Sequence, residues 1–274
     1  GYLTLEGHIG MVMIGEGRAT YQGETLDGAE ALKRAGLKPV VLSSKEGLIL
    51  LSGTTSVTAF ASLAIYDAQT LSLTADIAGS FTLEVLKGTL MAMDERLMAV
   101  RPHPDQINTA ANIRAILKDS PMLERYRGHR VQDALSIRCM PQLHGPVKKA
   151  IKDAQTTLAI ELNSSVDNPL IFDEEDGGAV ALMGYNAAKK AYDSMHLAKY
   201  ILAAELICDG QALDCYEDKR CAKGTQAIYD LLRSKVPEMD NDMPLTPYLE
   251  AVAQQIIDGA YIRAVDVSIG ELKF

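Results

Sequence analysis

The sequence predicts an all-α protein, an elongated bundle of long helices with minor short strands. Between Val57 and Leu97, apolar residues recur at steps of three and four, which is the period of a helix with a buried face. The stretches 147–160 and 187–213 show the same period, and no tandem repeat or linker divides the chain. Long helices that are apolar on several faces are typical of a bundle core. We therefore expect residues 1–274 to form one helical domain.

Glycine, proline and capping residues indicate where each element begins and ends. The expected elements are, in chain order, a buried helix over 3–14, a short strand or hairpin over 18–24, a helix over 27–34, a helix from Ser43 or Ser44 to 51, a helix over 54–100, a helix over 105–117, a polar loop over 120–129, a helix from Pro141 or Pro146 to about 163, an acidic hairpin over 173–178, and helices over 187–213, 225–234 and 248–269. If unbroken, the helix over 54–100 would be about 70 Å long.

Composition and charge exclude several classes of protein. Apolar residues make up 47% and charged residues 23%, which is ordinary for a globular protein. The net charge of −9 and the absence of a basic run argue against nucleic acid or an anionic membrane as a partner. No stretch reads as a membrane span and no signal peptide is visible, so we expect a cytoplasmic location. The four cysteines and five histidines show no metal-ligand spacing, so we expect no metal site.

A polar cluster precedes the expected helix that ends near 163. It contains Gln132, Asp133, Ser136 and Arg138. The guanidinium of Arg138 is a planar fork of donors that matches a carboxylate with two hydrogen bonds. Gln132, six residues earlier, lies near enough to the same helical face to reach the same ligand. A structural role is the alternative, in which both side chains satisfy backbone carbonyls beside a helix end.

The order of the motifs around this cluster is distinctive. Gln132-Asp133 is followed by SIRCMPQ at 136–142, a long helix, and DNPL at 167–170. The segments HIGMVMIGEGRATYQGE, GAEALKRAGLKPVVLSSKEGLILLSGT and RPHPDQINTAANIR precede it in the same relative order. In these motifs the chain resembles the histidine and phenylalanine ammonia-lyase family along nearly its whole length. The resemblance implies that family's central helical bundle, which is also like that of fumarase, and a homotetramer.

The resemblance also implies a reaction. It implies a carbon–nitrogen lyase of the ammonia-lyase or aminomutase type, which eliminates ammonia from an aromatic or histidine-like α-amino acid. The family makes its electrophile from an Ala-Ser-Gly tripeptide that cyclises to 4-methylidene-imidazol-5-one (MIO), with no external cofactor. Counting back from His8, Gly1 falls at the glycine of that triad. Arg138 matches the arginine that binds the substrate carboxylate, and Gln132 matches the active-site glutamine.

Several positions depart from the family pattern. Ser52 replaces an asparagine that contacts the electrophile and the substrate, and Leu135 replaces a catalytic tyrosine. Leucine can neither transfer a proton nor donate a hydrogen bond. The N-terminal region that carries the family's base tyrosine is not in the sequence, and a segment near 184–187 is missing. His8, the histidine nearest to the expected electrophile, is the best histidine candidate for a role.

Three functions remain open on these residues. The first is the lyase, favoured by the motif order with Arg138 and Gln132. The second is a catalytically inactive family member that acts as a structural or regulatory subunit, favoured by Leu135 and Ser52. The third is a helical scaffold or binding protein that shares only the fold.

Overall fold

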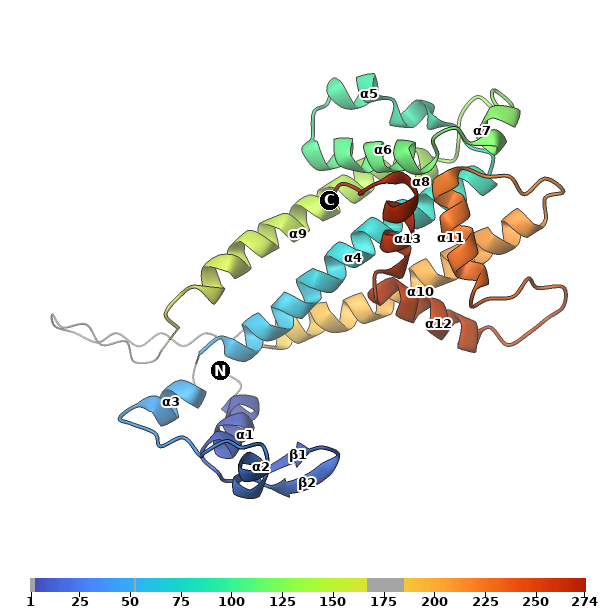
Figure 1. Ribbon diagram of the computed structural model, residues 1–274. Helices are drawn as coiled ribbons and strands as arrows, with labels where there is room; N and C mark the ends of the chain where they lie inside the picture. Colours follow the sequence, from blue (N-terminus) through green and yellow to red (C-terminus); the bar gives the residue numbers. More distant parts are fainter. Residues whose placement is uncertain (1–2, 52, 167–184) are drawn as a thin grey trace. The chain divides into compact units, whose positions relative to one another are not determined.

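The computed structural model is mostly helical in the part of the chain that it describes (Figure 1). The described residues are 3–51, 53–166 and 185–274. They belong to two compact units, the first drawn from 1–64 and 156–192 and the second from 65–155 and 193–274. The predicted all-α fold with minor strands is confirmed, whereas the single domain stays a prediction. The hairpin expected over 173–178 lies outside the described residues.

The first unit begins with short elements. They are α1 (Leu3–Met13), β1 (Arg18–Tyr21), β2 (Glu24–Asp27), α2 (Gly28–Arg34) and α3 (Glu46–Leu51). The two strands pair antiparallel, so the expected hairpin is confirmed. Its turn residues Gln22 and Gly23 have φ of 50° and 85°, as the tight turns that match strand twist require. The expected burial of the first helix is wrong, because Ile9 is 62% exposed and α1 packs mainly on the short helices α2 and α3.

Helix α4 (Thr55–Val85) is shorter than the helix predicted over 54–100. Lys87 adopts the left-handed backbone conformation, with φ of 58°. The N–H groups of Lys87 and Gly88 donate back to the carbonyls of Glu84 and Leu83, which closes the helix end. The hydroxyl of Thr89 and the carboxylate of Asp94 then cap two new short helices. The predicted extent of this helix, to residue 100, was therefore wrong.

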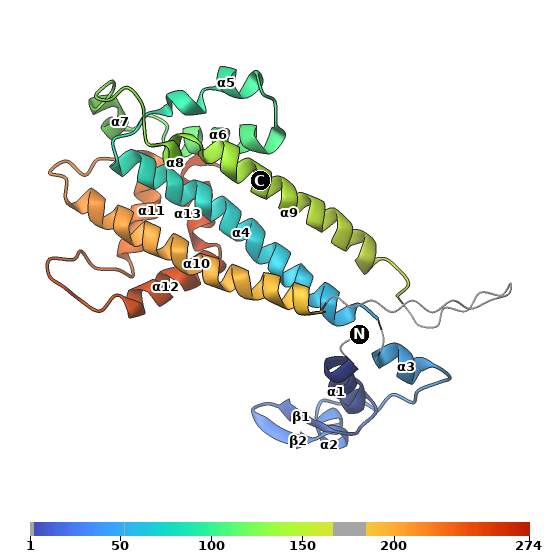
Figure 2. The same ribbon diagram turned by 180° about the vertical axis from the view of Figure 1, so that it is seen from behind.

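The second unit is a helical bundle (Figure 2). It contains α4 from residue 65 onward, α9 up to residue 155, α10 from residue 193 onward, and the other elements that follow α4. The elements that follow α4 are η1 (Leu90–Met93), α5 (Glu95–Ala99), α6 (Pro104–Ile116), α7 (Pro121–Arg125), α8 (Leu135–Arg138), α9 (Met140–Leu162), α10 (Tyr185–Asp214), α11 (Lys223–Arg233), α12 (Thr246–Ile257) and α13 (Ala260–Ile269). The helix predicted over 248–269 is two helices, because Gly259 between them takes φ of 68°. The loop expected over 120–129 contains the short helix α7, capped by Ser120.

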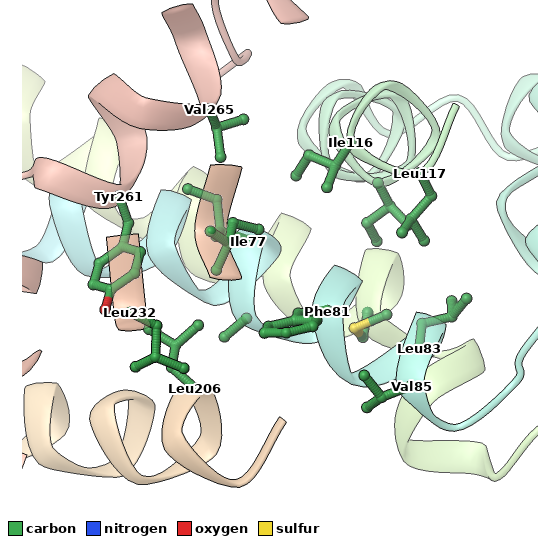
Figure 3. Packing of buried hydrophobic residues seen from close by; sticks show 14 of the residues in the cluster. Ile77, Phe81, Leu83, Val85, Ile116, Leu117, Leu206, Leu232, Tyr261 and Val265 are labelled. Carbon is green, nitrogen blue, oxygen red and sulfur yellow. The ribbon is translucent and has the colours of Figure 1, made fainter. Parts of the chain in front are cut away.

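The apolar core of the second unit lies where α4, α6, α10, α11 and α13 meet (Figure 3). Phe81 of α4, Ile116 of α6 and Leu206 of α10 are fully buried in it. Leu232 of α11 and Tyr261 of α13, from the C-terminal part of the chain, are also fully buried in this core. Each such side chain contributes about 1.5–3 kcal/mol when it leaves water. The C-terminal helices therefore belong to the same core as α4.

By length and composition only, the stretch Glu46–Val85 would suffice to cross a membrane, contrary to our expectation from the sequence. A core helix of a water-soluble protein passes the same test, so one such helix is weak evidence. The C-terminal half of α4 carries Asp76 and Glu84, both fully buried and hydrogen-bonded to other parts of the protein. This half of α4 is therefore a core helix of the second unit.

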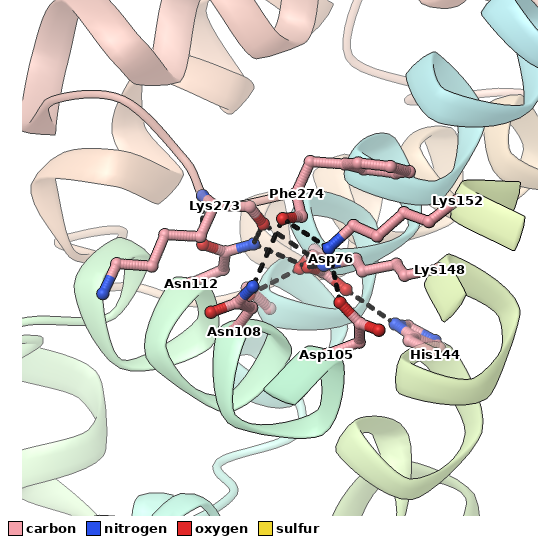
Figure 4. Close-up of polar contacts among 10 residues, drawn as sticks. Asp76, Asp105, Asn108, Asn112, His144, Lys148, Lys152, Lys273 and Phe274 are labelled. Carbon is pink, nitrogen blue, oxygen red and sulfur yellow. Dashed lines mark hydrogen bonds and ion pairs between the residues drawn. The ribbon is translucent and has the colours of Figure 1, made fainter. Parts of the chain in front are cut away.

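A buried carboxylate joins three helices of this unit (Figure 4). Asp76 of α4 is fully buried. Its Oδ2 accepts from Lys148 Nζ of α9 at 2.5 Å and from Asn112 Nδ2 of α6 at 2.8 Å. Its Oδ1 lies 2.8 Å from Nδ1 of His144, one turn earlier on α9. A buried charge is tolerated only with such partners, so Asp76 fixes how α4, α6 and α9 pack.

The same cluster holds the last residues of the sequence. Lys273 donates its N–H to Asn112 Oδ1 at 2.8 Å, and its carbonyl accepts from Asn112 Nδ2 at 2.8 Å. Lys152 Nζ of α9 lies 2.5 Å from Asp105 Oδ1 and 3.0 Å from the carbonyl of Phe274 (Figure 4). Helices α6 and α9 are therefore linked both directly and through this terminal segment.

Two carboxyl groups, the buried Asp209 and the partly buried Glu205, also lie between α4 and α10. Oγ1 of Thr82 is 2.9 Å from Glu205 Oε1 and 2.8 Å from Asp209 Oδ2. A hydroxyl has one proton and can donate to only one of them. Burial raises the pKa of Asp209 to about 8 against the opposing effect of the Thr82 hydrogen bond. Near neutral pH the protonated Asp209 can thus donate to Thr82, which donates to Glu205.

Removing the amine that pairs with Asp76 should destabilise the protein strongly. Lys148→Met leaves a fully buried carboxylate without its cation, and we expect a loss of about 3–5 kcal/mol in the free energy of unfolding. The matched control is Lys149→Met, because Lys149 is exposed and pairs with Asp153 one turn along the surface. That change should cost less than about 1 kcal/mol. Urea unfolding followed by circular dichroism measures both, and equal losses would contradict the prediction.

The Asp209 carboxyl should make stability depend on pH. The folded protein holds its proton up to about pH 8, whereas the unfolded chain releases it near the ordinary value of 3.8. The free energy of unfolding should therefore fall as pH rises from about 4 to about 8, by about 1.4 kcal/mol per pH unit from this group.

Asp209→Asn should remove that part of the slope, and the exposed Asp240→Asn should leave it unchanged. Denaturant unfolding at a series of pH values measures the slope. If Asp209→Asn and the parent protein showed the same slope, the buried carboxyl would not carry a proton in the folded state.

Candidate functional site

The predicted polar cluster forms one compact turn before α9. Ala134 is the N-cap of α8, and Cys139 is its C-cap, directly before α9 begins at Met140. Ile137 is buried and anchors this turn in the core. The two side chains selected from the sequence, those of Gln132 and Arg138, meet at its surface. This placement follows from the pattern of the segment, because buried Ile137 anchors a short turn on which Leu135 and Ser136 are exposed.

A buried carboxylate ties the turn to the rest of the second unit. Asp133 is almost fully buried, and its Oδ2 accepts from the backbone N–H of Thr89 at 2.7 Å. Its Oδ1 lies 3.8 Å from Nη1 of Arg130 and makes no hydrogen bond within the described residues. Asp133 is therefore a positioning residue, since it connects the segment that carries Gln132 to the segment that follows α4.

Arg138 and Gln132 are hydrogen-bonded to each other. Nη1 of Arg138 donates to Oε1 of Gln132. The described residues give the Arg138 guanidinium no carboxylate partner, so its Nε and Nη2 donors remain available, together with the amide N–H₂ of Gln132. The alternative in which Arg138 and Gln132 both satisfy backbone carbonyls has no support in the described contacts. The pair can bind a carboxylate through several donors at once.

Leu135 lies three residues before Arg138, on the same face of α8. Its side chain is 72% exposed. An exposed aliphatic side chain next to a guanidinium supplies shape but no proton and no hydrogen bond. The exposed side chain of Leu135 cannot take part in proton transfer, and its contact with a ligand stays a prediction.

Other predicted site residues belong to the first unit. Gly1 and Ser52 lie outside the described residues. His8 lies on α1 and is exposed. The described contacts give it no catalytic arrangement, so its role stays a prediction.

Glu6 of α1 contacts the start of α4, which no pattern in the sequence predicts. Oε1 of Glu6 accepts from the backbone N–H of Ser56 at 3.2 Å and from the Ser56 hydroxyl. A carboxylate at a helix N-terminus is stabilised by the unpaired N–H groups there. Only the fold reveals this contact, because the two residues are 50 positions apart. It connects the segment after Gly1 to the helix that follows Ser52.

No group of three His, Cys, Asp or Glu side chains among the described residues is arranged to hold a metal ion. Gly1, the residue that the resemblance places in the MIO triad, lies outside the described residues, so the MIO group stays a prediction.

Sequence comparisons identify relatives of this chain. Histidine ammonia-lyase of Alkaliphilus oremlandii is 32% identical over 353 residues, which cover 96% of this chain and 70% of that protein. The alignment is longer than the 274-residue chain, so the relative contains residues that this chain lacks, in agreement with the predicted missing segment. Histidine ammonia-lyase of Sorangium cellulosum is 48% identical over 182 residues, which cover 65% of this chain but only 35% of that protein.

A structural comparison confirms the fold. The crystal structure of a tyrosine aminomutase from Streptomyces globisporus superposes with a TM-score of 0.89 at 23% identity. The match covers 99% of this chain and 73% of that protein. The helical bundle expected from the resemblance is therefore correct. A family model described as aromatic amino acid lyase matches residues 1–182. This match and the 32% identity to a full relative show that the chain belongs to the aromatic amino acid lyase family.

Proposed function

We propose that the protein is a carbon–nitrogen lyase that eliminates ammonia from an aromatic or histidine-like α-amino acid, or an aminomutase that shifts its amino group. The observation that carries the proposal concerns Arg138. Its guanidinium is hydrogen-bonded to Gln132 and has no carboxylate partner among the described residues. Family membership supplies the reaction class, and this pair supplies the recognition of the substrate. The scaffold that shares only the fold is excluded, because the chain is related in sequence to ammonia-lyases along 96% of its length.

In this proposal Arg138 holds the substrate carboxylate. Its Nε and Nη2 form the two parallel hydrogen bonds that a guanidinium makes to a carboxylate. The Gln132 amide oxygen holds the guanidinium, and its nitrogen can donate to the same substrate. Fixing the carboxylate also fixes the carbon that loses its proton and the carbon that loses its amine, which lowers the entropy cost of reaction.

The elimination requires catalysis at both the β C–H bond and the C–N bond, because the β-proton is weakly acidic and the amine is a poor leaving group. When present, an MIO group made from a triad ending at Gly1 would activate the amine as an electrophile. The described residues do not contain that triad, so the roles derived from this chain are those of Arg138, Gln132 and Asp133. Ser52 and Leu135 remain proposed contacts of the electrophile and the substrate.

A catalytically inactive family member is the alternative function. The side chain of Leu135 is aliphatic and 72% exposed at the position where the resemblance places a catalytic tyrosine. Such a protein would keep the Arg138–Gln132 pair and bind an amino acid or another subunit without turnover. The experiments below separate the two functions.

We also propose a cytoplasmic homotetramer with an amino acid as its small-molecule ligand. Large apolar side chains are exposed on the long helices, including Val147 and Ile160 on α9 and Leu197 and Ile201 on α10. A monomer seldom exposes so many, and association would cover them. The four cysteines are free thiols, which suits a reducing compartment.

Changing Arg138 should reduce turnover more than a similar change elsewhere. Arg138→Lys keeps the charge but loses the bidentate geometry, so we expect kcat/KM to fall by about 100-fold. The control is Arg127→Lys, an exposed arginine that pairs with Glu124, which should change kcat/KM by less than about twofold. Release of ammonium and the ultraviolet absorbance of the unsaturated acid, with phenylalanine, tyrosine and histidine as substrates, measure turnover. An active Arg138→Lys variant with unchanged kcat/KM would remove Arg138 from the proposed site.

The intact mass of the protein expressed from its complete gene tests the electrophile. We expect a deficit of two water molecules, mapped by digestion to the peptide that ends at Gly1, because cyclisation and dehydration each release one. An unmodified mass together with no turnover would favour the inactive family member.

A further inference from the structure

A pocket of about 760 Å³ lies in the second unit, apart from Gln132 and Arg138. Three segments line it: the stretch after α4, the turn between α6 and α7, and the residues from α7 to Val131. None of the residues assigned to the proposed reaction lines it. Its most unusual lining residue is Lys87.

Lys87 occupies a backbone position that normally favours glycine. Its φ is 58°, and it directly follows the last turn of α4, where a left-handed residue closes the helix. A lysine there is strained relative to glycine or asparagine, since its Cβ crowds the backbone. A strained residue at the edge of a pocket points to a function for its side chain.

Two aromatic rings hold the ammonium of Lys87. Nζ lies 4.4 Å from the ring centroid of Tyr126 and 4.8 Å from that of Tyr216. Tyr216 is itself fixed, because its hydroxyl donates to the carbonyl of Val85 at 2.7 Å. The rings restrict the ammonium through cation–π contacts but do not neutralise it. No carboxylate among the described residues forms an ion pair with Lys87.

The two arginines that line the pocket each have an acidic side chain nearby. Arg127 pairs with Glu124, and Nη1 of Arg130 lies 3.8 Å from the buried carboxylate of Asp133. Asp119, the remaining acid of the lining, is exposed and makes no described ion pair with Lys87. Among the lining residues, Lys87 is therefore a cation without a described ion pair, and Asp119 is an acid without one.

The rest of the wall is partly apolar. Leu90, Met91 and Leu123 line it, and Met91 is 75% exposed although it is a large apolar side chain. An anion that carries an apolar body would gain from both features, since the body would cover exposed apolar surface. An inorganic anion would use only the ammonium.

We propose that this pocket binds an organic monocarboxylate, with its carboxylate on Lys87 Nζ and its apolar body against Leu90, Met91 and Leu123. The ligand would lie next to the backbone of Thr89, whose N–H holds Asp133. Binding would therefore stabilise the segment that carries Gln132 and Arg138. The proposal does not rest on the proposed enzyme activity.

Calorimetric titration with hexanoate tests this site. The parent for the test carries Arg138→Met, so that the carboxylate-binding arginine of the proposed active site cannot hold the probe. In that background we expect one site per chain. Lys87→Asn should weaken binding by about tenfold or more, Lys87→Arg, which keeps the charge, should bind more tightly than Lys87→Asn, and the exposed Lys235→Asn should bind as the parent does. Hexanol, which lacks the charge, and acetate, which lacks the apolar body, should each bind more weakly than hexanoate.

Lys87→Asn should fold, because asparagine tolerates the left-handed backbone. Circular dichroism and thermal unfolding check this, and Lys87→Gly provides the same test in a second variant. Equal affinities of Lys87→Asn and Lys235→Asn for hexanoate would overturn the proposal, as would no binding to the Arg138→Met parent. Neither result depends on turnover, so a failure here is distinct from a failure of the proposed lyase activity.

Discussion

The buried ion pair between Asp76 and Lys148 is the interaction on which the packing of the second unit depends. Both side chains are fully buried, so neither can regain water without opening the bundle. His144 and Asn112 contact the same carboxylate. A charged group with directional partners permits one arrangement of α4, α6 and α9, whereas apolar contacts alone would permit several.

Close packing then places the candidate site. A Cβ on Gly79 would lie 2.3 Å from Sδ of Met140, and one on Gly145 would lie 2.7 Å from the backbone nitrogen of Gln106. These two glycines therefore let α9 approach α4 and α6 closely at its first turns. Arg138 lies two residues before Met140, the first residue of α9, so the same packing determines where its guanidinium lies. The function proposed for Arg138 depends on this rigid support.

Asp133 links the candidate site to the pocket that contains Lys87. The Asp133 carboxylate accepts a hydrogen bond from the backbone N–H of Thr89, and Gln132 precedes Asp133 in the chain. A ligand in the pocket would therefore lie close to the segment that carries Gln132 and Arg138.

The sequence by itself determined the helical class, the family, and the expectation that Gln132 and Arg138 lie close together, because helical periodicity and motif spacing are local properties. It also located most helix ends, since glycine, proline and capping residues act on their own neighbours. Tertiary structure decided that α4 ends at Val85, because Lys87 takes a left-handed conformation that its residue type does not favour. It also decided the partners of Asp76 and the contact of Glu6 with Ser56, because these contacts join residues far apart in the chain, and no local pattern encodes them.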